Sequence, residues 1–370
     1  MSKAASKAKP AEKMEALMSQ ATKAVANFNP ELAVQFYKKA LDMAPQDTTI
    51  IDTLADVYLQ LGLTNDALNL FQQSVSIQPR LNPIKWLYLA QLQYGSDAVS
   101  SYKTGIEYLS KTQRTEITKQ QISKAYCSMA EIYLTDLCYD NDAETLCEQY
   151  VKKSLEIDGS CLDAMQTMVS LRISQNRGKE AIDLIKTVYD MIMQKREQLR
   201  NRTVMEDLSH SQTKSTDQST ADDAIMNMPE TDFCIATTKL LIECAVHNSE
   251  LAECAIELGI DLLNFDDDNI ELWYLVGVAA LATNPPDTEA SRYHLDQALV
   301  MVNTLIENNK QNDRDDENSQ LIEYLNLIKD HIQIAENLEG GSVNANDVIL
   351  EDVLEEEEAW SDDDNMEAEN

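Results

Sequence analysis

Residues 33–45, A-V-Q-F-Y-K-K-A-L-D-M-A-P, carry a spacing that returns 34 positions later in residues 67–79, A-L-N-L-F-Q-Q-S-V-S-I-Q-P. In each stretch a small residue, an aromatic residue, a second small residue and a proline follow one another at separations of four, three and five. Two matches in register predict a structural unit that repeats every 34 residues. The positions are Ala33, Tyr37, Ala40 and Pro45, then Ala67, Phe71, Ser74 and Pro79.

This spacing and period are typical of the second helix of the tetratricopeptide repeat, a hairpin of two helices. Small residues are needed where two helix backbones approach closely, and the aromatic ring fills the gap between neighbouring hairpins. The proline ends the hairpin because it cannot continue a helix. One hairpin cannot bury its apolar side alone, so several must stack. We therefore predict an all-α, superhelical tetratricopeptide-repeat solenoid.

The rest of the chain predicts three further kinds of segment. About seven hairpins are expected within residues 14–338, and an apolar stripe over 318–338 predicts a C-terminal capping helix. Residues 1–13 hold four lysines and one acid and are predicted to be a disordered basic leader. The polar residues near 207–227 predict a flexible loop. Residues 339–370 hold thirteen acids and no Lys or Arg, which predicts a disordered acidic tail.

The charge of the chain restricts its partners. Sixty-four Asp and Glu against thirty Lys and Arg give a net charge of −34. The leader (+3) and the tail (−13) leave −24 on residues 14–338, so the solenoid itself is acidic. Such a chain should repel nucleic acid and anionic membranes and attract a basic partner. No apolar run approaches the roughly 18 residues of a membrane span.

Catalysis and metal binding have no support in the sequence. Seven cysteines without a C-x-x-C spacing favour reduced thiols in a cytoplasmic or nuclear protein. The four histidines are far apart, and no phosphate loop or catalytic triad spacing is present. We therefore predict no enzyme activity, no catalytic residue, no metal site and no cofactor.

The binding residues are expected on the first helix of each hairpin, which lines the concave face of such a solenoid. If Ile51, Trp86 and Tyr126 are packing positions, the exposed groove positions follow one and five residues later. These positions are rich in carboxylates, which can pair with lysine or arginine. A solvated acidic face without a ligand is the alternative. The candidate client-binding residues are Asp52, Asp56, Gln91, Glu131 and, one turn further on, Asp136.

One aromatic residue, Trp360, lies within the acidic run E-D-V-L-E-E-E-E-A-W-S-D-D-D of the tail, residues 351–364. It is a candidate contact residue of the tail. Two interpretations stay open: the segment holds a basic peptide, or it docks on its own domain.

The chain resembles the fungal family of assembly chaperones dedicated to large-subunit ribosomal protein four. The resemblance rests on residues 86–109, on the lengthened hairpin at 125–158, and on the acidic tail with its tryptophan. It implies a chaperone that captures one newly made, very basic ribosomal protein and shields its long internal loop. It further implies delivery to nuclear pre-ribosomes, hence a cytoplasmic and nuclear location, and we expect a monomer in a 1:1 complex.

Two other functions stay open at this stage: a tetratricopeptide-repeat scaffold and a histone-type chaperone. A third is excluded, because co-chaperones that bind acidic tails need a clamp of Lys, Asn and Arg in the groove. Here the corresponding positions hold Met18, Thr22, Thr53 and Asp56.

Overall fold

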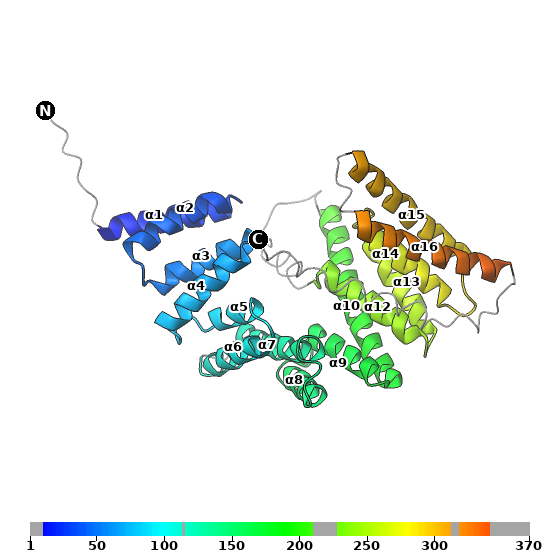
Figure 1. Cartoon of the computed structure of the whole chain (residues 1–370), viewed down its shortest axis with the longest axis horizontal. Coiled ribbons are helices and arrows are strands. Elements are labelled where there is room, and N and C mark those ends of the chain that lie inside the picture. The colour runs from blue at the N-terminus through cyan, green and yellow to red at the C-terminus, as the bar shows by residue number, and fades with distance from the viewer. Residues whose placement is uncertain (1–9, 113–114, 210–227, 312–317, 341–370) are drawn as a thin grey trace. The chain divides into compact units, whose positions relative to one another are not determined.

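The computed structural model of the chain describes residues 10–112, 115–209, 228–311 and 318–340. Within these ranges it consists of helices joined by short connections, with no strand. The described helices form two compact units, which meet within one helix, between Thr167 and Met168. The all-α repeat fold predicted from the sequence is confirmed (Figure 1).

Unit 1 is a stack of helical hairpins in which each helix packs on the next one along the chain. The first and second helices of each hairpin alternate. They are α1 (Pro10–Ala26) and α2 (Pro30–Met43), α3 (Thr48–Gln60) and α4 (Thr64–Ile77), α5 (Lys85–Gln91) and α6 (Gly95–Leu109), α7 (Glu116–Leu134) and α8 (Ala143–Ile157). The first residues of α9 (Leu162–Ser174) complete the unit.

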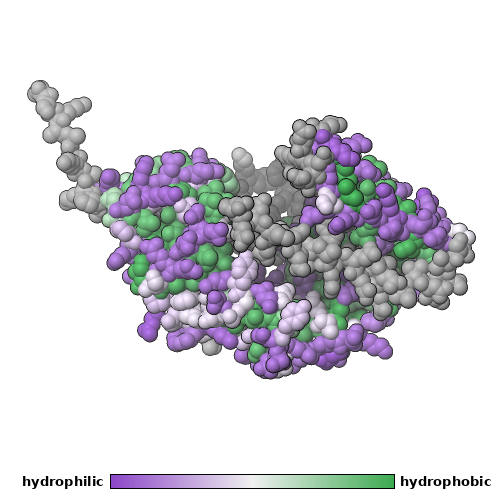
Figure 2. Space-filling view, viewed as in Figure 1, coloured by the Kyte–Doolittle hydropathy of each residue, from purple (hydrophilic) through white to green (hydrophobic). Residues whose placement is uncertain are grey.

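The small and aromatic positions of the repeat form the core of this stack. Ala33, Ala67 and Phe71 are fully buried in one apolar cluster that also holds Tyr37. Helices α2 and α4 end two residues before Pro45 and Pro79, as the prolines require. Figure 2 shows apolar residues between the polar ones on the visible face of α1–α4.

The third hairpin shows why its second helix carries a glycine at a small-residue position. A Cβ atom on Gly105 would lie 2.8 Å from Leu87 Cδ2 and 3.0 Å from Trp86 Cβ. Helices α5 and α6 therefore approach so closely that no side chain fits between them at this point. Helix α5 has only seven residues.

Unit 2 continues the alternation with α10 (Gly178–Ser209), α12 (Thr231–Ala245), α13 (Glu250–Leu263), α14 (Ile270–Leu281) and α15 (Thr288–Gln311). Arg196 of α10 forms a buried ion pair with Asp261 of α13, which fixes these two helices. Helix α16 (Asn318–Glu339) packs on α15 and α14, as the predicted capping helix should.

Several predicted boundaries differ from the structure by a few residues. Helix α1 begins at Pro10, because proline suits the first position of a helix, so residues 10–13 are helical and not part of a leader. Helix α10 extends to Ser209, past the predicted start of the loop at 207. The remainder of the leader, the loop residues 210–227 and the tail from residue 341 lie outside the described residues. No described helix is both long and apolar enough to span a bilayer.

Candidate functional site

Asp52 lies inside the protein and not on an accessible face, which corrects the prediction. Its side chain is 5% exposed. It accepts a hydrogen bond from Ser74 Oγ on α4 and another, 2.9 Å long, from Asn82 Nδ2. Asp52 would be exposed in an isolated hairpin, but in the stack the residues that lead into the next hairpin cover it.

A buried lysine completes this network. Lys85 of α5 has no exposed surface, and its Nζ donates to the Ser74 carbonyl at 3.2 Å and to Ser74 Oγ at 3.0 Å. Burial lowers the pKa of Lys85, while the negative charge of Asp52 opposes that shift. Since Ser74 links an acid to a cation, the network joins α3, α4 and α5, and Asp52 has a structural role.

Asp56, one turn further along α3, is the partly accessible carboxylate of this helix. Burial, followed by the negative charge of Asp52, raises its pKa to about 6. It also faces Tyr88 of α5, whose pKa is raised by burial and by the charge of Asp56. No Lys or Arg within the described residues forms an ion pair with Asp56. The carboxylate is thus partly desolvated and uncompensated, which favours pairing with a cation from outside.

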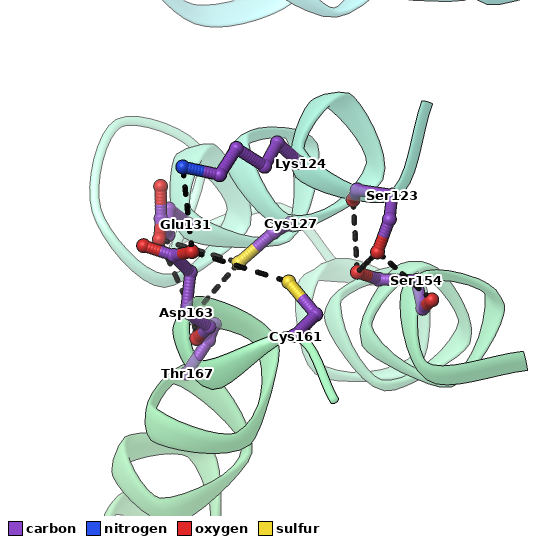
Figure 3. A network of polar contacts seen from close by, with 8 residues as sticks. All are labelled: Ser123, Lys124, Cys127, Glu131, Ser154, Cys161, Asp163 and Thr167. Atoms are coloured by element: carbon purple, nitrogen blue, oxygen red, sulfur yellow. Dashed lines mark hydrogen bonds and ion pairs between the residues drawn. The ribbon is translucent and has the colours of Figure 1, made fainter. Parts of the chain in front are cut away.

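Glu131 forms a second uncompensated acidic centre, shown in Figure 3. The residue as a whole is exposed on α7, but its carboxylate is turned toward neighbouring side chains. One carboxylate oxygen accepts a hydrogen bond from Cys127 Sγ at 3.4 Å and a second one from Thr167 Oγ1 of α9 at 3.3 Å. Burial of the carboxylate raises its pKa, the two donors lower it, and the charge of Asp163 raises it again. Lys124 reaches Asp163 at 3.9 Å but forms no ion pair with Glu131.

The helices around Glu131 are fixed by short-range polar contacts. Ser123 of α7 and Ser154 of α8 are fully buried, their hydroxyls are 2.8 Å apart, and Ser154 Oγ also lies 2.8 Å from the Ser123 carbonyl (Figure 3). Two serines allow the backbones of α7 and α8 to approach closely at this point. The accessible side of α7, with Glu131, is thereby held in place beside α9.

Gln91 and Asp136 have different surroundings. Gln91, the last residue of α5, is exposed as predicted. Asp136 follows α7, and its Oδ2 accepts a 2.8 Å hydrogen bond from the backbone N–H of Gly95. It therefore caps the start of α6 and does not continue the face of α7, since that helix ends at Leu134. This corrects the prediction that Asp136 lies one turn along the groove.

The structure thus brings Asp56 together with Asp52, and Glu131 with residues of α9, but it does not join these two centres. Sequence reasoning missed Tyr88 and Asp163. Tyr88 lies three residues before Gln91, on the same side of a helix, so that spacing was an available signal. Trp360 lies outside the described residues. Among the residues that the structure describes, no group of His, Cys, Asp and Glu side chains is arranged to hold a metal ion.

We name the accessible acidic surface of unit 1 the first-helix face. It comprises Asp56 of α3, Tyr88 and Gln91 of α5, Glu131 of α7 and Asp163 of α9. Its carboxylates meet aromatic and polar neighbours. The arrangement is suited to binding cationic side chains.

Comparison with known proteins defines the class first. Residues 24–95 match the tetratricopeptide repeat family. Together with the stacked hairpins, this match gives the chain the fold of tetratricopeptide-repeat proteins. A solved structure described as "Assembly Chaperone of RpL4 (Acl4) (Residues 1-338)" has the same fold. It has a TM-score of 0.57 and 22% identity, and the match covers 76% of this chain and 99% of that one.

Two curated fungal relatives narrow the class further, and both are named "Probable assembly chaperone of rpl4". The protein of Schizosaccharomyces pombe is 31% identical over 251 residues, which cover 65% of this chain and 66% of the relative. The protein of Emericella nidulans is 26% identical over 304 residues, which cover 77% and 70%. The chain is therefore a homologue of these proteins, and the resemblance seen in the sequence is confirmed.

The raised pKa of Asp56 leads to a prediction about stability. Because the folded-state pKa, about 6, lies above the ordinary value of 3.8, the native state binds more protons between these two values. The contribution of this carboxyl to stability therefore falls as the pH rises through that window. We expect Asp56→Asn to stabilise the protein at neutral pH by about 1 kcal/mol, a value reduced for partial solvent screening.

Urea unfolding at neutral pH and near pH 4 measures this effect. The gain should be present at neutral pH and absent near pH 4, where Asp56 is already protonated. Asp42→Asn, at an exposed position of α2, is the control and should change little at either pH. Equal effects of the two substitutions at neutral pH would contradict the assignment.

Proposed function

We propose that the chain is a chaperone, not an enzyme, dedicated to the ribosomal protein specified in its relatives' names, rpl4. It binds this very basic protein of the large subunit through the first-helix face and shields it before assembly. The observation that carries the proposal is the pair of carboxylates, Asp56 and Glu131, held partly desolvated with no Lys or Arg paired to them. The homology supports the identity of the client.

The proposal includes the route of the client. The chaperone is a monomer that forms a 1:1 complex, meets the client in the cytoplasm and accompanies it to nuclear pre-ribosomes. It touches neither nucleic acid nor membrane directly, because the net charge of −34 repels both. The acidic tail supplies further negative charge for client surfaces that the first-helix face leaves uncovered, and Trp360 supplies an aromatic contact within it.

A binding experiment with a salt series tests the function. The full-length protein is mixed with purified rpl4 or with purified histones, which are similarly basic, and both affinities are measured from about 50 mM to about 500 mM salt. We expect rpl4 to bind at least about tenfold more tightly than histones at each salt concentration. Both affinities should fall as salt rises, because the contacts are between charged groups.

Each alternative has its own outcome. Equal affinity for rpl4 and histones would indicate a general chaperone for basic proteins. Absence of rpl4 binding would overturn the proposal and favour a scaffold. Salt-independent binding of rpl4 would show that the carboxylates are not the binding groups.

A further inference from the structure

The turns within the four hairpins of unit 1 each expose a large apolar side chain. These turns join the first helix to the second and comprise residues 27–29, 61–63, 92–94 and 135–142. Such side chains usually gain stability by burial, yet two of them are almost fully exposed. The exposed fractions are 95% for Phe28, 44% for Leu63, 71% for Tyr94 and 97% for Tyr139.

These four turns lie along one edge of the stack. In consecutive antiparallel hairpins, every turn from first to second helix lies at the same end, and the connections between hairpins lie at the other. The hydrogen bond from Gly95 N, the first residue after the third turn, to Asp136 Oδ2 connects this end of α6 to the fourth turn. A Cβ atom on Gly95 would also lie 3.6 Å from Leu137 Cδ2. We call this surface the turn edge.

The turn edge carries acidic side chains and no basic ones. Its four turns, each taken with the first four residues of the helix that follows, hold seven acids and no Lys or Arg. The connections at the opposite edge, counted in the same way, hold four acids and five Lys or Arg. Acids in the first turn of a helix also stabilise that helix. The difference between the two edges, combined with exposed rings on one of them, indicates a surface for a cationic partner.

Phe28 has a backbone conformation that disfavours its own side chain. Its φ is +54°, in the left-handed region, and the equivalent position one repeat later is Gly62, with a φ of +72°. The backbone of a bulky residue in this region is strained. Since Phe28 is 95% exposed, its ring makes little packing contact that could offset the strain. Glycine would be the better residue for the fold alone. The phenylalanine therefore indicates a role outside the isolated protein.

We propose that the turn edge is a second docking surface, which binds an extended arginine- and lysine-containing segment of the client. This segment is distinct from the one on the first-helix face, and its assignment to the client rests on the function proposed above. Guanidinium groups stack on the rings of Phe28, Tyr94 and Tyr139 and pair with the neighbouring carboxylates. The lengthened turn at 135–142 supplies a ring and three of the acids.

Two triple variants of the full-length protein test the proposal. The edge variant is Phe28→Gly, Tyr94→Ser and Tyr139→Ser. The control variant is Met43→Ser, Leu81→Ser and Ile117→Ser, which removes apolar side chains that are also exposed but belong to the opposite edge. We expect rpl4 to bind the edge variant at least about tenfold more weakly than the wild type and the control variant nearly as well as the wild type.

The single variant Phe28→Gly separates a binding role from a structural one. It should raise the melting temperature, because strain is removed, and should lower the affinity for rpl4. A lower melting temperature would show that Phe28 serves the fold. Unchanged rpl4 binding by the edge variant, or equal weakening by the control variant, would overturn the proposal.

A synthetic peptide in which arginine and leucine alternate tests the turn edge without rpl4, so the outcome does not depend on the proposed client. We expect it to bind the wild type, to lose affinity for the edge variant, and to bind the control variant nearly as well as the wild type. If rpl4 fails to bind while the peptide behaves in this way, the client is wrong and the turn edge stands. If the peptide does not bind, or binds the edge variant equally well, the turn edge is not a docking surface for basic segments.

Discussion

Replacing Ala67 with glutamate is expected to unfold or severely destabilise unit 1. Ala67 has no exposed surface and packs in the same apolar cluster as Ala33, Phe71 and Tyr58. A glutamate at this position must either bury a charge without a partner or force α4 away from its neighbours. Either outcome costs several kcal/mol, about 3–5, which is a large fraction of the stability of a typical domain.

Thermal and urea unfolding followed by circular dichroism measure this effect. The control is Asn69→Glu, which introduces the same side chain at an exposed position of the same helix. It should change stability by no more than about 0.5 kcal/mol. A melting temperature of Ala67→Glu close to that of the control would mean that the close helix contact at Ala67 is not needed.

The packing positions could be predicted from sequence because they depend on side-chain size within one repeating unit. The small residues Ala33 and Ala67 and the aromatic Phe71 lie where the spacing placed them. Their surroundings are set by the hairpin itself and by an adjacent hairpin of the same kind. A period of 34 residues therefore carries enough information to predict the core.

The binding face could be predicted only in part, because burial at its margins depends on non-repeating contacts. Asp52 occupies a groove position by spacing, but Asn82 and Lys85 come from the next hairpin and enclose it together with Ser74. Asp136 left the predicted face because α7 ends at Leu134. No repeat rule specifies a lysine at position 85 or a helix end at 134.

The exposure of the aromatic residues on the turn edge could not be predicted from the sequence either. Phe28 and Tyr139 are apolar, and composition alone would assign such residues to the core. Their exposure follows from backbone geometry: one adopts a left-handed φ in a tight turn, and the other lies in the lengthened connection between α7 and α8. Neither feature has a sequence signature as clear as the repeat spacing.

Reversing the charge of Asp56 and Glu131 together is expected to have the largest effect on client binding. Lysine at both positions replaces attraction with repulsion on two first helices, α3 and α7, at carboxylates that have no ion-pair partner within the described residues. An exposed ion pair contributes about 0.2–1 kcal/mol, and a partly desolvated one contributes more. Reversal at two sites should therefore weaken rpl4 binding by at least about tenfold, or 1.4 kcal/mol.

The same double variant should leave the stability of the free protein at neutral pH unchanged or higher. The charges of Asp52 and Asp163 oppose ionisation of Asp56 and Glu131, so lysine at these two positions replaces repulsion within unit 1 with attraction to those acids, which offsets the cost of burying the new charges. A loss of affinity combined with an unchanged or higher melting temperature would thus separate a binding role from a folding role. Isothermal titration and thermal unfolding of the same samples provide both quantities.

The matched control for this experiment is Asp42→Lys with Glu156→Lys, which makes the same change in net charge at exposed positions of the second helices α2 and α8. If long-range attraction alone holds the client, both double variants will weaken binding equally, and the loss will vanish near 1 M salt, where the Debye length is about 3 Å. If Asp56 and Glu131 contact the client directly, only their reversal will cause the full loss, and part of it will persist at high salt. Equal behaviour of the two double variants would contradict the assignment of the first-helix face as the binding surface.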